Sequence, residues 1–121
     1  MNKLLTPLEL RVMNILWKLK EAFVKDLLEY WPDDAKPAYN TISTTVRILQ
    51  EKGYVDYKAY GRTHQYYPLL SKVDYQKRFL SNAVENVFSG SMSSLVSALM
   101  DGKSISEPEL EKLEDLIKKS K

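Results

Sequence analysis

Residues Pro37–Leu69 of this 121-residue chain decide its fold, and they read PAYNTISTTVRILQEKGYVDYKAYGRTHQYYPL. The first part has one apolar side at helical spacing, which predicts a helix over residues 38–52. Gly53 follows where a helix commonly ends in a left-handed residue. Two short stretches rich in Tyr, Val and Thr come next, residues 54–58 and 63–69, with a glycine-containing turn between them. We therefore predict a helix followed by a β-hairpin. The residues on the apolar side are Ile42, Thr45, Val46 and Leu49.

The opposite side of this helix is unusual in composition, because it carries short hydrogen-bonding side chains rather than the Lys and Glu of most solvated faces. Asn and Arg pair with base edges, and Ser and Thr reach bases or phosphates. This pattern favours a helix that enters a DNA major groove, although a helix that merely tolerates Ser and Thr is the alternative. The residues on this side are Asn40, Ser43, Thr44, Arg47 and Glu51.

The hairpin adds positive charge beside the helix. Arg62 and His64 lie at or next to its tip at residues 59–63, and Lys58 comes just before it. A positive hairpin tip next to a recognition helix is the plan of a winged helix, whose tip contacts phosphate or a minor groove. The helix N-terminus also favours phosphate. The candidate DNA-binding residues are Lys36, Tyr39, Asn40, Thr41, Ser43, Thr44, Arg47, Lys58, Arg62 and His64.

Two further helices precede this segment. Thr6 and Glu9 have the spacing of a capping box, with Pro7 at the first helical position of a helix that runs to about Lys20. A second helix is predicted over Phe23–Trp31, and Pro32 should end it. The fold class that follows is mainly α with a small β-hairpin, a winged helix-turn-helix over residues 1–70.

Residues 71–121 form a separate region with three predicted helices, at 71–89, 92–100 and from about 107. Roughly 50 residues are near the lower limit for an independent core, so their apolar stripes need a partner. A second copy of the chain is the simplest one, and packing back onto the first region as a monomer is the alternative. We predict a helical dimerisation region. Its candidate residues are Phe79, Leu80, Val84, Val87, Phe88, Leu95, Leu99, Leu113 and Leu116.

Composition excludes several kinds of site. The chain has no cysteine and a single histidine, His64, so we expect neither a metal site nor a cofactor, and no enzyme activity. It has no apolar run of about 20 residues and no signal-peptide core, which predicts a cytoplasmic protein without membrane insertion. The net charge of +2 is weak support for nucleic acid. A winged helix that binds another protein is therefore the competing interpretation; DNA binding requires Lys36, Arg47, Lys58 and Arg62 to share one face.

The chain resembles the penicillinase-repressor (BlaI/MecI/CopY) family of bacterial transcription repressors over nearly its whole length. The segments that carry the resemblance are LTPLELRVMNILWK (Leu5–Lys18), NTISTTVRILQEKGYVDYK (Asn40–Lys58), HQYYPLL (His64–Leu70) and GSMSSLVSALMD (Gly90–Asp101).

The resemblance implies a homodimeric repressor on a palindromic operator in double-stranded DNA, with half-sites spaced by about 34 Å or a multiple of it. Family members that govern antibiotic resistance are relieved by cleavage in the tail, triggered by a membrane sensor protease. The matching peptide here is Ala98–Leu99, where those members carry Asn-Phe. This difference puts the same cleavage specificity in doubt. Copper-responsive members carry a C-terminal cysteine cluster, and without cysteine this chain has no thiolate copper site.

Overall fold

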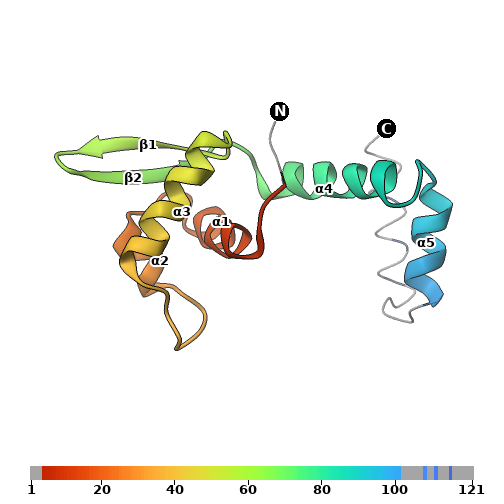
Figure 1. Ribbon diagram of the computed structural model, residues 1–121, viewed down its shortest axis with the longest axis horizontal. Coiled ribbons are helices and arrows are strands. Elements are labelled where there is room, and N and C mark those ends of the chain that lie inside the picture. The colour runs from red at the N-terminus through yellow and green to blue at the C-terminus, as the bar shows by residue number, and fades with distance from the viewer. Residues whose placement is uncertain (1–3, 102–107, 109–110, 112–114, 116–121) are drawn as a thin grey trace. The chain divides into compact units, whose positions relative to one another are not determined.

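A computed structural model describes residues 4–101, 108, 111 and 115 and divides the chain into two compact units, Met1–Tyr75 and Gln76–Lys121 (Figure 1). The boundary lies inside a helix, whose first turn belongs to the first unit. The elements are α1 (Pro7–Leu19), α2 (Val24–Glu29), α3 (Tyr39–Glu51), β1 (Val55–Tyr60), β2 (Thr63–Pro68), α4 (Lys72–Asn86) and α5 (Met92–Asp101).

The start of α1 confirms the predicted capping box. The Thr6 hydroxyl accepts the Glu9 backbone N–H at 3.3 Å, and the Glu9 carboxylate accepts the Thr6 N–H at 2.9 Å. The same carboxylate oxygen accepts a hydrogen bond from Lys52 Nζ at 2.6 Å, just after the end of α3. Burial alone would raise the pKa of Glu9, but the bonds from Lys52 and Thr6 outweigh it and leave the pKa below its usual value. One buried carboxylate thus ties the end of α3 to the start of α1.

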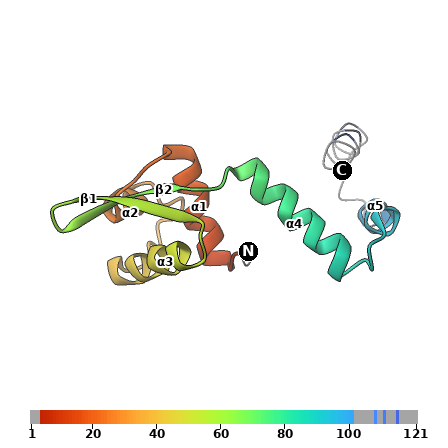
Figure 2. The same cartoon turned by 90° about the horizontal axis from the view of Figure 1, so that it is seen from above.

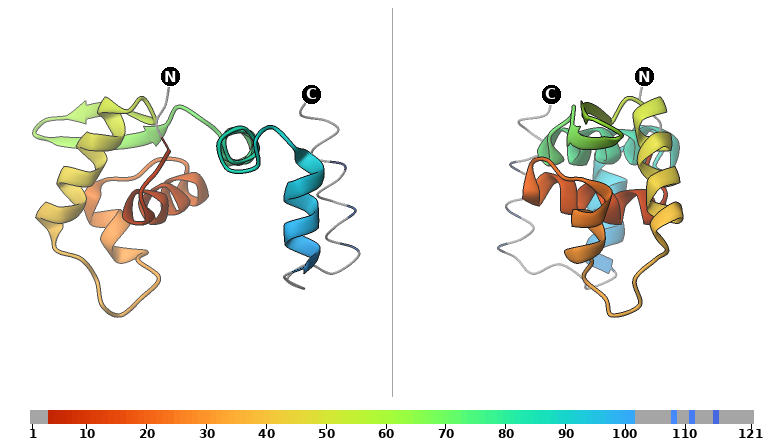
Figure 3. Two further views of the ribbon diagram at one scale, coloured as in Figure 1. Left: turned by 45° about the vertical axis from the view of Figure 1, so that its right-hand side comes forward. Right: turned by 90° about the vertical axis from the view of Figure 1, so that its left-hand side faces the viewer.

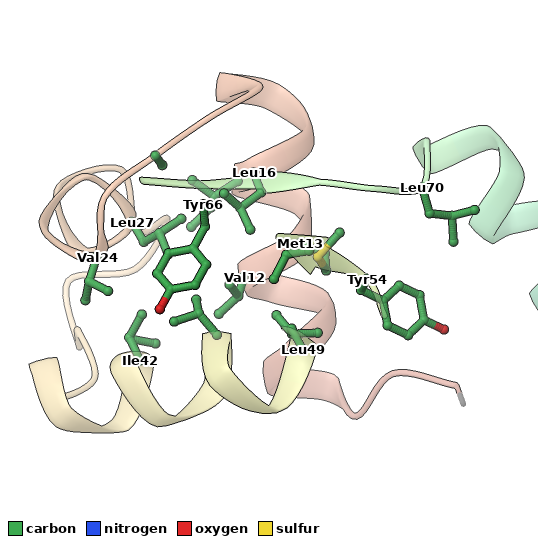
Figure 4. Close-up of a cluster of buried hydrophobic side chains, with 14 of the residues drawn as sticks. Val12, Met13, Leu16, Val24, Leu27, Ile42, Leu49, Tyr54, Tyr66 and Leu70 are labelled. Atoms are coloured by element: carbon green, nitrogen blue, oxygen red, sulfur yellow. The ribbon is translucent and has the colours of Figure 1, made fainter. Parts of the chain in front are cut away.

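The core of the first unit fills the space between the three helices and the hairpin (Figure 4). The predicted apolar side of α3 is confirmed, because Ile42, Val46 and Leu49 are fully buried and Thr45 is nearly so. The Thr45 hydroxyl donates to the Thr41 carbonyl at 2.7 Å, which satisfies this buried polar group within the helix. The other fully buried aliphatic and Met side chains are Val12, Met13, Leu16, Leu27 and Val55.

The hairpin pairs β1 and β2 antiparallel, from Val55 opposite Pro68 to Tyr60 opposite Thr63. Its turn is the two residues Gly61-Arg62, and Gly61 has a φ of +64°, which suits glycine. The predicted strand end at residue 58 was therefore wrong by two residues, because residues 59 and 60 still pair across the hairpin. The three helices lie on one side of the hairpin (Figure 3), and its closed end projects beyond α2 and α3 (Figure 2).

Two helices are shorter than predicted. Helix α2 begins at Val24 because the Asp26 carboxylate accepts the backbone N–H of Phe23 at 2.9 Å and makes Phe23 the N-cap. It ends at Glu29, although Trp31 is still buried beyond it. Helix α4 ends at Asn86 rather than near Ser89, because Ser89 and Gly90 both have positive φ. Ser71 caps α4 as predicted, and its hydroxyl accepts the Asp74 N–H at 3.1 Å.

The arrangement of three helices followed by a β-hairpin is a winged helix, as predicted. Ala22 extends the hairpin by one bridge, because its N–H and carbonyl bond to Tyr66 at 2.9 and 2.8 Å. Tyr75 in the first turn of α4 is buried in this unit, and its ring lies 5.9 Å from Trp17 and 5.8 Å from Tyr54. Helix α5 matches the predicted 92–100 segment, whereas most of the last predicted helix lies outside the described residues, which include only 108, 111 and 115 there.

Candidate nucleic-acid interface

A cleft of about 710 Å³ lies between α3 and the hairpin, with the start of α2 at its edge. Five of the ten predicted DNA-binding residues line it: Tyr39, Ser43, Arg47, Arg62 and His64. The sequence pattern predicted these residues separately for a helix and a wing, and the fold brings them to one place. The remaining lining residues are Phe23, Val24, Lys25, Gln50, Tyr57, Thr63 and Tyr66.

Three cations from three different elements meet in this cleft: Lys25 of α2, Arg47 of α3 and Arg62 of the hairpin turn. All three residues are exposed, and no Asp or Glu is among the described residues that line the cleft. Arg47 also donates to the Ser43 hydroxyl one turn earlier at 3.5 Å. The cleft therefore presents uncompensated positive charge to an anion.

The floor of the cleft is aromatic. The rings of Tyr57 and His64 stack with centroids 3.9 Å apart and planes 11° apart, and Tyr66 lies beside both. The Tyr66 ring extends from β2 toward α3 and is 5% exposed (Figure 4). Burial raises the pKa of the Tyr66 hydroxyl, although the nearby Arg47 guanidinium opposes that rise. His64 is thus held in a ring stack rather than free at the wing tip.

The N-terminus of α3 has no side-chain cap, a feature it shares with the short helix α2. Hydroxyls of Thr6, Ser71 and Ser91 cap α1, α4 and α5, whereas the N-cap of α3 is Ala38, which has no side-chain hydrogen bond. The first N–H groups of a helix have no acceptor within it, so this end leaves donors for an anion. Tyr39, Asn40 and Thr41 surround it, and all three side chains are exposed.

The other predicted DNA-binding residues do not line the cleft. Lys36 is exposed in the segment before α3. Asn40, Thr41 and Thr44 are exposed on α3 itself. Lys58 neighbours Tyr57, and successive strand side chains point to opposite faces. Its ammonium lies 6.0 Å from the ring of Tyr67, on the other face of the hairpin. Of the four cations expected to share one face, the cleft therefore brings together only Arg47 and Arg62, with Lys25 as the third cation in place of Lys36 and Lys58.

Sequence reasoning missed six polar or aromatic residues of the cleft: Phe23, Lys25, Gln50, Tyr57, Thr63 and Tyr66. The periodicity of the second helix placed Lys25 outside its apolar stripe. This was the only indication in the sequence that the Lys25 side chain is available for binding. Its position beside Arg47 follows from how α2 packs on α3, and residue spacing does not encode that packing.

The predicted dimerisation residues of the second unit differ in exposure. Val87 is 70% exposed and Phe79 51% exposed, whereas Val84 and Leu95 are buried within the single chain. Leu80, Phe88 and Leu99 are half-buried, and Leu113 and Leu116 lie outside the described residues. Ala98 and Leu99 of the candidate cleavage peptide lie in the last turns of α5, with Ala98 exposed.

In the part of the chain that the structure describes, no helix has the length and apolar character to cross a membrane. The same residues include no cluster of three or more His, Asp or Glu side chains placed to hold a metal ion.

Comparisons with known proteins agree with this geometry. The methicillin resistance regulatory protein MecI of Staphylococcus aureus strain N315 is 30% identical over 92% of this chain and 90% of its own length. The penicillinase repressor of Bacillus licheniformis is 22% identical over 93% of this chain and 88% of its own.

Among solved structures, the solution structure of the DNA-binding domain of the repressor BlaI matches with a TM-score of 0.53 at 26% identity. The match covers 62% of this chain and 94% of that domain. The family model described as penicillinase repressor matches residues 5–119. The chain therefore belongs to the penicillinase repressor family.

Proposed function

We propose that this protein is a dimeric transcriptional repressor that binds a palindromic operator through α3 and the hairpin. The observation that carries the proposal is the cleft in which Arg47 of α3 faces the same space as Arg62 of the hairpin turn. MecI is a methicillin resistance regulatory protein and BlaI is a repressor with a DNA-binding domain, so both relatives support this function. We propose a cytoplasmic location, because a repressor has to reach its operator DNA.

The chemistry of α3 supports a role in base readout. Its exposed side carries Asn40, Thr44 and Arg47, whose side chains make hydrogen bonds to base edges or phosphates. Its uncapped N-terminus supplies backbone donors to one phosphate. Arg62 at the hairpin tip supplies a charge to the next part of the backbone or to the minor groove. Readout and positioning thus come from two elements that share one cleft.

The second unit supports the dimer. Phe79 and Val87 are large apolar side chains that α4 leaves more than half exposed in a single chain. Because each side chain is already partly covered, its burial against a second copy is favourable by about 1–2 kcal/mol. Two-fold symmetry would then present two copies of the cleft to two half-sites. We expect Phe79 and Val87, rather than the buried Val84 and Leu95, to make the contact.

Relief of repression is proposed to act through the second unit, by a sensor-linked signal such as proteolysis near Ala98–Leu99. The exposure of Ala98 supports access to this peptide. Its place inside α5 requires that the last turns of the helix unwind before a protease can hold the peptide in an extended form.

The experiment is an anisotropy titration of the full chain against labelled DNA from the protein's own promoter region and against random DNA, at several salt concentrations. We expect affinity for the promoter DNA to exceed that for random DNA by about 1,000-fold or more. Arg47→Ala should weaken promoter binding by about 1–3 kcal/mol and relax selectivity at one base pair. Lys18→Ala, an exposed cation of α1 that does not line the cleft, is the matched control.

Equal affinity for promoter and random DNA at all salt concentrations would refute the proposal and favour a winged helix that binds another protein. If promoter binding is specific but Arg47→Ala does not change it, the protein is still a repressor, but Arg47 does not read a base.

A further inference from the structure

The cleft between α3 and the hairpin is more aromatic than phosphate contact requires. Five of its twelve lining residues carry rings: Phe23, Tyr39, Tyr57, His64 and Tyr66. A phosphate group is held by cations and N–H donors and gains nothing from a ring face. The ring surfaces at this site therefore favour a ligand that itself contains a flat ring.

The rings form a fixed surface. Tyr57 and His64 are stacked 3.9 Å apart, and the nearly buried Tyr66 supports both from the same face of the hairpin. On the opposite side of the cleft, Tyr39 at the start of α3 is 54% exposed. A flat aromatic molecule inserted between α3 and the hairpin would contact ring faces and edges on both sides, in the offset geometry that such pairs prefer.

The size and charge of the cleft restrict the chemical class of the ligand further. The volume of about 710 Å³ falls within the roughly 300–1,000 Å³ range of small-molecule sites. Lys25, Arg47 and Arg62 enter the cleft, and no carboxylate is among its described lining residues. The site thus combines aromatic walls with a net positive rim, a combination that selects a planar aromatic ring bearing an acidic group.

We infer that this cleft is a binding site for a small planar aromatic anion, which competes with DNA for the same residues. The competition rests on the proposed DNA-binding function, whereas the ligand site itself does not. Because Arg47 and Arg62 cannot contact a bound carboxylate and DNA at once, occupancy of the cleft would release the repressor without cleavage of the chain.

The test of the site uses the full chain, 2-naphthoate as the probe, and backbone amide NMR shifts as the readout, with no DNA present. We expect saturable shifts at residues of α3 and the hairpin with a dissociation constant of about 1 mM or tighter, from the usual free energy per atom of small ligands. The neutral analogue 2-naphthamide should bind about tenfold more weakly, because it lacks the charge-assisted bonds. Arg62→Gln should weaken 2-naphthoate binding by a similar factor, and Lys18→Gln should not.

The outcomes separate this inference from the proposed function. Absence of saturable shifts in the cleft, or equal binding of 2-naphthoate and 2-naphthamide, would overturn the site whatever the DNA titration shows. With specific DNA binding established, 2-naphthoate at ten times its dissociation constant should raise the apparent dissociation constant for DNA by about tenfold. An unchanged affinity for DNA would overturn the competition.

Discussion

Replacement of Glu9 by Gln tests how the C-terminal end of α3 is held. The Glu9 residue is 5% exposed, and one of its carboxylate oxygens accepts hydrogen bonds from the Thr6 backbone and from Lys52. Gln keeps the shape and the acceptor oxygen but removes the charge. The change therefore isolates the electrostatic part of the link between α1 and the end of α3.

The magnitude follows from those two bonds. A hydrogen bond to a charged group contributes about 1.5–3 kcal/mol, against about 0.5–1.5 for a neutral one, so the bond from the Thr6 N–H loses about 1 kcal/mol. The bond from Lys52 keeps its charged donor but loses the attraction between opposite charges, about 1 kcal/mol more. The negative charge near the N-terminus of α1 adds about 0.3–1 kcal/mol, and the lower desolvation cost of Gln offsets part of the loss. We expect Glu9→Gln to lower the free energy of unfolding by about 2 kcal/mol near neutral pH.

The effect should depend on pH with a definite sign. The folded state lowers the pKa of Glu9 below the reference value of 4.5, so its stabilisation is complete above that value. It is lost as the pH falls through the lower folded-state pKa, where the protonated carboxyl resembles Gln. The assay is urea unfolding of both proteins at one fixed protein concentration, since dissociation of the proposed dimer would couple to unfolding.

Lys52→Gln and the double variant complete the measurement. The double variant should be more stable than the sum of the two single effects implies, by about 1 kcal/mol, because the two residues contact each other. A wild-type advantage over Glu9→Gln that persists unchanged far below pH 4.5 would refute the reasoning, as would a purely additive cycle.

Two other outcomes follow from the surface of the molecule. Arg62→Ala at the hairpin tip should weaken binding to all DNA sequences and lower the slope of log affinity against log salt by about 1, since one phosphate contact is lost. The control variant Lys18→Ala should leave the slope unchanged. An unchanged slope for Arg62→Ala would show that the tip does not touch phosphate. Phe79→Asp should sediment as a monomer, because it places a charge in an apolar interface, whereas Asn82→Asp, an exposed position of α4, should remain a dimer. A dimeric Phe79→Asp variant would place the interface elsewhere.

The parts of the fold that depend on local rules were predictable from sequence. The Thr6–Glu9 capping box and the buried side of α3 each depend on neighbouring residues, and both appear in the structure. Helix and strand ends were less predictable, because tertiary contacts decide them. Trp31 is buried without being helical, which apolar spacing cannot distinguish from a longer α2.

The candidate site divides in the same way. Arg47 was predictable from the composition of one helix face, and Arg62 from its place at a turn. The place of Lys25 in the cleft was not predictable, because it depends on how α2 packs beside α3. Lys58 shows the same limit: its position in the sequence beside the tip gave no sign that the pleat turns it toward Tyr67 and away from the cleft.

The burial of Tyr75 against Trp17 has a consequence for spectroscopy. The Trp17 indole N–H donates to the Leu70 carbonyl at 2.8 Å, and its ring lies 5.9 Å from that of Tyr75. Both partners belong to the segment that leads from the hairpin into α4, so if that segment detaches, the indole gains water and loses its carbonyl acceptor. The emission wavelength of Trp17, measured in a Trp31→Phe background, should therefore shift to the red when the segment leaves the core, giving the chain an intrinsic optical reporter at the end of its first unit.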